Sequence, residues 1–99
     1  MKIEVKVLGP GCANCRRLYS EAAKAIAQFA APATLTKVED IHAITNYKIL
    51  ALPGLVIDGE LKSAGRVPSA AEILTWLATA AMKQESKETY AGISGDDGR

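Results

Sequence analysis

A pair of cysteines, Cys12 and Cys15, lies between a strand-like segment and a helix-like segment, and this placement constrains the chain more than any other feature. Residues 2–8 carry apolar side chains at alternate positions, which predicts a strand. Residues 9–11, Gly-Pro-Gly, break that pattern and predict a tight loop. Helical spacing of apolar residues begins near Cys15, so the sequence places both sulfurs at a strand-to-helix junction.

The start of a helix alters the chemistry of a thiol. The first helical turn leaves backbone N–H groups without partners, and the positive end of the helix dipole lies there. Both effects favour the thiolate form of Cys12. Two intervening residues put the second sulfur roughly one turn further along, which is compatible with the Cα separation of about 4.4–6.8 Å that a disulfide requires. We therefore expect Cys12 and Cys15 to open and close a disulfide without a change of fold.

The segment after the cysteines is predicted to be one long helix that Pro32 ends. Its buried positions are expected to be Leu18, Ala22, Ala25, Ile26 and Phe29. Residues 33–39 alternate weakly and contain threonine and valine, which predicts a short strand at a sheet edge.

Asp40 is a suitable N-cap for a short helix through about Asn46, and this helix is expected to bury Ile41 and Ile44. An apolar connector then leads to Pro53. The Asp58-Gly59 dipeptide joins two strand-like runs, and this combination predicts a β-hairpin.

Ser69 and Glu72 form the sequence pattern of a capping box, which marks the start of a final helix that runs to about Lys83. Its buried positions are expected to be Ile73, Leu74, Leu77 and Ala81. The element order is βαβαββα, which predicts an α/β fold with a mixed four-stranded sheet and helices on both faces. We expect one domain over residues 1–83 and a disordered tail over residues 84–99, whose first residues extend the helix.

Composition excludes several classes of partner. The chain has 99 residues with 12 Lys and Arg against 11 Asp and Glu, a net charge of +1 that favours neither nucleic acid nor a membrane surface. The N-terminal segment is too charged for a signal peptide, and no apolar run is long enough to span a membrane. We therefore expect a cytoplasmic protein, and we expect it to be a monomer. Two cysteines cannot form a disulfide framework, and in a reducing compartment a lone Cys-x-x-Cys is more often catalytic or metal-binding than structural.

Several motifs in order resemble the thioredoxin fold, and in particular the small, glutaredoxin-sized proteins of archaea and bacteria known as redox-active disulfide proteins. The matching segments are residues 11–15 (Gly-Cys-Ala-Asn-Cys), 51–55 (Ala-Leu-Pro-Gly-Leu), 56–62 (Val-Ile-Asp-Gly-Glu-Leu-Lys) and 65–67 (Gly-Arg-Val). The similarity spans residue 1 to about residue 82.

The resemblance implies a thiol-disulfide oxidoreductase that acts on protein disulfides and is recycled by a flavin-dependent, thioredoxin reductase-like electron donor. Cys12 would attack the substrate and Cys15 would resolve the mixed disulfide. The Cys12–Cys15 disulfide would be the redox group, with no separate cofactor. Pro53 would be the cis-proline that faces the disulfide, and the backbone of Leu52 would pair with the bound segment.

The substrate-binding residues that the resemblance implies are Pro10, Gly11, Leu52, Pro53 and Gly54. The apolar rim of Pro10, Leu52 and Gly54 is either ordinary loop packing or the groove that receives a partner segment. The chain also departs from ordinary thioredoxins, because Gly11 precedes the first cysteine and Ala13-Asn14 separates the pair. Lys6 stands where thioredoxins have a buried aspartate, so the proton acceptor for Cys15 is not identified.

A second interpretation assigns the same sulfurs to soft-metal transport, because copper-carrying domains also place Cys-x-x-Cys between a first strand and a first helix. Those domains usually have Met two residues before the first cysteine, where this chain has Pro10. A structural zinc site needs four ligands, and His42 is the only histidine. A third interpretation is an interaction module whose disulfide only regulates docking. Dithiol chemistry without a metal is the interpretation that we favour.

Four other side chains have alternative roles. His42 is expected to be exposed on its helix, and Trp76 to belong partly to the core. Arg16 and Arg17 either only solvate their helix, or favour the thiolate and attract an acidic partner. The sequence leaves these two possibilities open.

Overall fold

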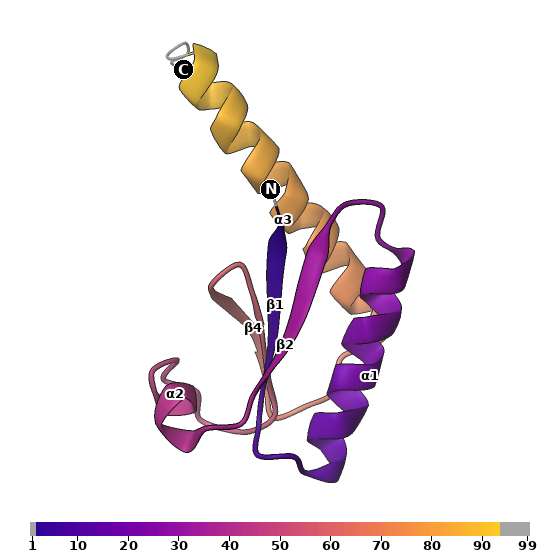
Figure 1. The fold of residues 1–99 in the computed structure, drawn as a ribbon, viewed down its shortest axis with the longest axis vertical. Coiled ribbons are helices and arrows are strands. Elements are labelled where there is room, and N and C mark those ends of the chain that lie inside the picture. The colour runs from indigo at the N-terminus through magenta and orange to yellow at the C-terminus, as the bar shows by residue number, and fades with distance from the viewer. Residues whose placement is uncertain (1, 94–99) are drawn as a thin grey trace.

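A computed structural model describes residues 2–93, with side chains up to Lys83. Its elements follow the predicted order βαβαββα (Figure 1). They are β1 (Ile3–Leu8), α1 (Ala13–Gln28), β2 (Ala33–Val38), α2 (Ile41–Thr45), β3 (Gly54–Ile57), β4 (Glu60–Ala64) and α3 (Ala70–Ile93). None of the helices within residues 2–93 combines the length and the apolar character that crossing a membrane requires.

The four strands form one mixed sheet in the order β2-β1-β3-β4. The central strand β1 is parallel to β2 and antiparallel to β3, and β3 is antiparallel to β4. Leu8, the last residue of β1, lies opposite Val38 at the end of β2 and Gly54 at the start of β3. One end of the sheet therefore gathers the loop after β1, the residues after β2, and Pro53.

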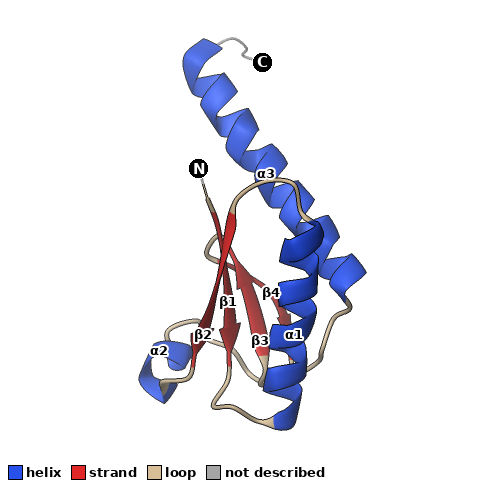
Figure 2. Cartoon of the chain, turned by 45° about the vertical axis from the view of Figure 1, so that its right-hand side comes forward, coloured by secondary structure: helices blue, strands red, loops and turns tan. Residues whose placement is uncertain are grey.

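Helices α1 and α3 lie together on one side of the sheet, and α2 lies apart from them (Figure 2). Apolar clusters cover both faces of the sheet, because successive side chains of a strand point to opposite faces. One cluster joins a sheet face to α1 and α3, and a smaller cluster joins Leu8 and Val56 to Ile44 of α2. The buried members of the larger cluster are Ile3, Val5, Val7, Leu18, Ala22, Ala25, Leu55, Ile57, Ile73, Leu77 and Ala80. Trp76 packs against this cluster as a partly buried side chain. The predicted fold class is confirmed.

Helix α3 begins with the predicted capping box. The Ser69 hydroxyl accepts a hydrogen bond from the Glu72 N–H at 3.2 Å, and the Glu72 carboxylate accepts one from the Ser69 N–H at 3.2 Å. A second carboxylate, that of Glu21 on α1, accepts a hydrogen bond from the Ala70 N–H at 2.8 Å. The start of α3 is therefore held against α1.

Two helix boundaries differ from the sequence-based expectation. Helix α1 begins at Ala13, because Cys12 is its N-cap. Helix α3 runs to Ile93 and does not end near Lys83. Residues 84–93 contain no proline and only one glycine, at position 92, so their sequence does not interrupt a helix. The first ten residues of the expected tail, 84–93, thus belong to α3. Residues 94–99 lie outside the described residues. The domain boundary between residues 83 and 84 stays a prediction.

The prediction that α2 buries two isoleucines is wrong for one of them. Ile44 is 2% exposed, whereas Ile41 is 50% exposed. Helix α2 has five residues, little more than one turn, and so presents a single isoleucine to the sheet.

The substitution Leu18→Ala is expected to lower the free energy of unfolding by about 2–5 kcal/mol, because it opens a cavity where a fully buried side chain joins α1 to the sheet. Leu50→Ala is the matched control, since Leu50 is fully exposed and its truncation should change stability by at most about 0.5 kcal/mol. Urea denaturation of the oxidised proteins measures both. Equal losses would contradict the placement of Leu18 in the core.

The start of α3 is expected to make stability depend on pH. Hydrogen bonds from Arg66, and then from the Ser69 N–H, lower the pKa of the Glu72 carboxyl below its ordinary 4.5. Such a group contributes stability that is present above the ordinary pKa and is lost as pH falls through the lowered value. Glu72→Gln should therefore reduce the free energy of unfolding at neutral pH, and this deficit should shrink in acid. Urea titrations at about pH 7 and about pH 3 test this, and a deficit of constant size would contradict it.

Candidate active site

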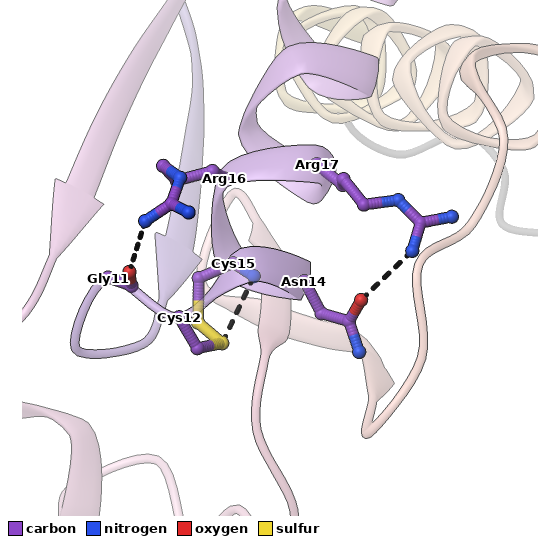
Figure 3. The surroundings of a disulfide bond; sticks show 6 residues. All are labelled: Gly11, Cys12, Asn14, Cys15, Arg16 and Arg17. Atoms are coloured by element: carbon purple, nitrogen blue, oxygen red, sulfur yellow. Dashed lines mark hydrogen bonds between the residues drawn. A yellow bond between two sulfur atoms is a disulfide. The ribbon is translucent and has the colours of Figure 1, made fainter.

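The two cysteines form a disulfide at the N-terminus of α1 (Figure 3). Their Cα atoms are 4.9 Å apart, within the separation of about 4.4–6.8 Å that disulfides adopt. Cys12 is exposed, whereas Cys15 is only 4% exposed. The pair therefore offers one sulfur to solvent and keeps the other inside the protein.

Cys12 is the N-cap of α1, and its Sγ accepts a hydrogen bond from the Cys15 N–H at 3.1 Å. The first turn of the helix contains no acidic residue, so no carboxylate offsets the positive end of the helix dipole there. A negative charge on the Cys12 sulfur is therefore favoured by a backbone donor and by the dipole together.

Gly9 is the residue that allows the buried sulfur to lie against the sheet. A Cβ at position 9 would overlap the Sγ of Cys15, and it would stand 3.2 Å from the Cβ of Cys15 and 3.8 Å from the Cβ of Pro53. The Gly9 N–H donates to the Val38 carbonyl at 3.0 Å, which fixes this backbone at the end of the sheet. The side chains of Cys15 and Pro53 therefore both lie close to Gly9.

Sequence reasoning assigned Gly9 only to a loop and missed this role. The one available signal was the glycine directly after the strand that leads to the cysteine pair. A glycine there can serve a turn or a close contact, and the sequence does not distinguish the two.

The loop before Cys12 depends on a second glycine. Gly11 has a φ of +97°, a conformation that residues with a Cβ rarely adopt. Its carbonyl accepts a hydrogen bond from the Arg16 guanidinium at 2.9 Å, while the Arg17 guanidinium donates to the Asn14 side-chain oxygen at 3.1 Å (Figure 3). Both arginines are exposed and hydrogen-bonded to residues that flank Cys12, so each adds a positive charge near the start of α1.

The other residues implied in substrate binding differ in accessibility. Pro10 is exposed, and Leu52 is half-buried against the cluster under α2. Pro53 is buried and follows a cis peptide bond. Gly54 is buried inside the sheet, with the Cδ1 of Ile49 at the place where its Cβ would stand. The structure thus brings Pro53 and Cys15 to the same glycine, Gly9, and leaves Pro10 and Leu52 as the accessible part of this set.

Lys6 does not face the cysteines. Val7 and Cys15 line the same cavity, and Lys6 precedes Val7 on the strand, so its side chain lies on the opposite face of β1. The Lys6 ammonium donates to the Tyr47 hydroxyl at 3.3 Å, and this hydrogen bond raises the pKa of Lys6. The residue that replaces the aspartate of ordinary thioredoxins therefore belongs to the α2 side of the sheet.

The described residues contain no group of three or more His, Cys, Asp and Glu side chains that could hold a metal ion. His42 is exposed on α2. A mixed sheet covered on both faces, with a disulfide at the first strand-to-helix junction and a proline close to the same glycine as the buried cysteine, defines a class of dithiol proteins that work by thiol-disulfide exchange.

Comparison with known proteins identifies the family within this class. Residues 1–78 match the thioredoxin domain family. A thioredoxin of Methanothermobacter thermautotrophicus is 39% identical over 71 residues, which cover 72% of this chain and 92% of that protein. A thioredoxin of Methanocaldococcus jannaschii is 28% identical over 71 residues, which cover 72% of this chain and 81% of that protein. The chain belongs to the thioredoxin family.

The protein is therefore a thiol-disulfide oxidoreductase with Cys12–Cys15 as its redox disulfide. The predictions of the family, of the fold and of dithiol chemistry are confirmed. The interpretation as a copper carrier has no support in these similarities.

Gly9→Ala is expected to destabilise the reduced protein by about 1–3 kcal/mol, because its Cβ would overlap the Cys15 sulfur. In a Cys15→Ala background the cost should be smaller, although the contact between the two Cβ atoms would persist. Urea denaturation in reductant, applied to the natural chain, Gly9→Ala, Cys15→Ala and the double variant, measures this double-mutant cycle. An unchanged cost in the Cys15→Ala background would show that the sulfur is not the obstacle.

Proposed function

We propose that the protein reduces disulfides of other proteins, with Cys12 as the attacking thiol and Cys15 as the resolving thiol. The observation that supports this assignment is the asymmetry of the two sulfurs. Cys12 is exposed at the N-cap, where a thiolate is favoured, and Cys15 is 4% exposed. A bulky protein disulfide can reach the first sulfur and is kept from the second.

The reaction proceeds in two exchanges. The Cys12 thiolate attacks one sulfur of the substrate disulfide, which forms a mixed disulfide and releases the first substrate thiolate. Cys15 then loses its proton and attacks the Sγ of Cys12, which releases the second substrate thiolate and forms the Cys12–Cys15 disulfide. Two electrons pass to the substrate, and each released thiolate takes up a proton.

The substrate segment would lie over Pro10, Gly11, Leu52, Pro53 and Gly54. In this arrangement the backbone of Leu52 pairs with the segment that carries the attacked cysteine. The exposure of Pro10, the partial exposure of Leu52 and the approach of both Pro53 and Cys15 to Gly9 support this location. Gly54 is buried, so it would contribute to this site by fixing the backbone where β3 begins, and it offers no open surface to a substrate.

The oxidised protein would be recycled by a flavin-dependent, thioredoxin reductase-like electron donor in the cytoplasm. The chain has two cysteines and both are in the redox pair, which suits a reducing compartment where no structural disulfide is needed. We propose that it works as a monomer and with neither nucleic acid nor membrane as a partner, in keeping with its net charge of +1.

Cys15→Ser should accumulate a covalent complex with a protein disulfide such as insulin, because the mixed disulfide on Cys12 cannot be resolved. Cys12→Ser is the matched control and should form little complex under the same conditions. Non-reducing electrophoresis and intact-mass measurement detect the complex, and reductant should dissolve it. Equal trapping by the two variants would overturn the assigned roles.

A further inference from the structure

A small cavity of about 20 Å³ lies beside Cys15. Its size is enough for one water molecule, which needs at least about 10–15 Å³. The walls come from α1, from the end of β1 and from the end of β2. Cys15 forms one side, and its titratable neighbours in the lining are Arg16, Tyr19, Lys37 and Glu39.

Glu39 follows the last residue of β2, and the sheet holds it close to the cysteine loop. The Gly9 N–H donates to the carbonyl of Val38, the residue before Glu39. The Glu39 Oε2 lies 3.8 Å from the point where a Cβ of Gly11 would stand. A carboxylate thus stands at the cavity wall opposite the loop that leads into the redox pair.

The second exchange needs a proton acceptor, because a thiolate and not a thiol is the nucleophile. Cys15 is 4% exposed, and removal from water disfavours the charged form of a thiol. Lys6 cannot take this proton, since it faces the α2 side of the sheet and is already a donor to Tyr47.

Among the titratable groups in the cavity lining, only one can accept a proton at neutral pH. Arginine and lysine side chains offer only N–H donors, and a phenol oxygen is a far weaker base than a carboxylate. The Lys37 ammonium lies over the Tyr19 ring, 4.8 Å from its centroid. The carboxylate of Glu39 is the remaining acceptor.

We propose that Glu39 accepts the proton of Cys15 through one water molecule in this cavity. The proposal rests on Cys15 being the resolving thiol. The proton passes from the Cys15 Sγ to the water, and a proton of that water passes to the Glu39 carboxylate. The Cys15 thiolate then attacks the Cys12 Sγ and breaks its bond to the substrate sulfur. The departing thiolate takes up a proton from solvent, and Glu39 releases its proton to solvent, which restores the carboxylate.

The two exchanges can be separated with the aromatic disulfide DTNB and an excess of reduced protein. Attack by Cys12 releases one coloured thiolate, and resolution by Cys15 releases the second. Glu39→Gln should leave the first phase within about twofold and slow the second by about tenfold or more at neutral pH, less than the 10²–10⁴ of a directly placed base. The deficit should close at alkaline pH, as the Cys15 thiol ionises without help. Glu39→Asp should recover part of the rate.

Asp40→Asn is the matched control, because it removes the same charge one residue away and keeps a side chain that can cap α2. Its second phase should stay within about twofold of the natural chain. The sign of the Glu39→Gln effect is decisive. Loss of a nearby negative charge by itself favours a thiolate and would speed resolution, whereas loss of a proton acceptor slows it.

Each outcome has one meaning. If the second phase of Glu39→Gln is unchanged or faster, Glu39 is not the acceptor. If Cys15→Ser also releases the second thiolate at the natural rate, the resolving role of Cys15 fails, and the proposal for Glu39 fails with it. If Cys15→Ser stops after one thiolate while Glu39→Gln releases both at the natural rate, only the assignment of Glu39 is overturned.

Discussion

The close approach of a buried sulfur to the backbone of Gly9 is the constraint on which the site depends. Gly9 follows the central strand β1, which pairs with β2 on one side and β3 on the other. The parallel neighbour brings Val38 to the Gly9 N–H, and the antiparallel neighbour brings Pro53 to the same place. A side chain at position 9 would occupy the space of the Cys15 sulfur. Val38, Pro53 and the Cys15 sulfur thus all lie close to Gly9, the residue that follows β1.

The different exposure of the two sulfurs follows from helical periodicity. Cys15, Leu18, Ala22 and Ala25 are spaced by three or four residues and form the buried stripe of α1. Cys12 precedes the first turn, so it lies outside the stripe and takes the N-cap position. Helix α1 therefore holds the Cys15 sulfur inside the protein. It places the Cys12 sulfur in solvent, at the positive end of the helix dipole. The same packing that stabilises α1 assigns the two cysteines their different chemistry.

Local sequence patterns predicted the fold and the redox pair, because each was encoded within a few neighbouring residues. The Asp58-Gly59 turn, the Ser69–Glu72 capping box and the Cys-x-x-Cys junction are of this kind. Features that depend on tertiary contacts were not predicted. The exposure of Ile41 depends on how α2 lies on the sheet, and the contact between Gly9 and Cys15 depends on the packing of α1.

The two faces of β1 also divide the charged groups of the site. Lys6 points to the α2 side, where it donates to Tyr47, and this leaves the α1 side of the strand free of a cation from β1 itself. The charged groups in the cavity beside Cys15 therefore come from other elements, with Arg16 from α1, Lys37 from β2 and Glu39 from the residue after β2. Because β2 is parallel to β1, its carboxyl end reaches the same end of the sheet as the cysteine loop. The βαβ unit thus supplies both the helix that holds the sulfurs and the Glu39 side chain that lines the same cavity as Cys15, although these groups are far apart in sequence.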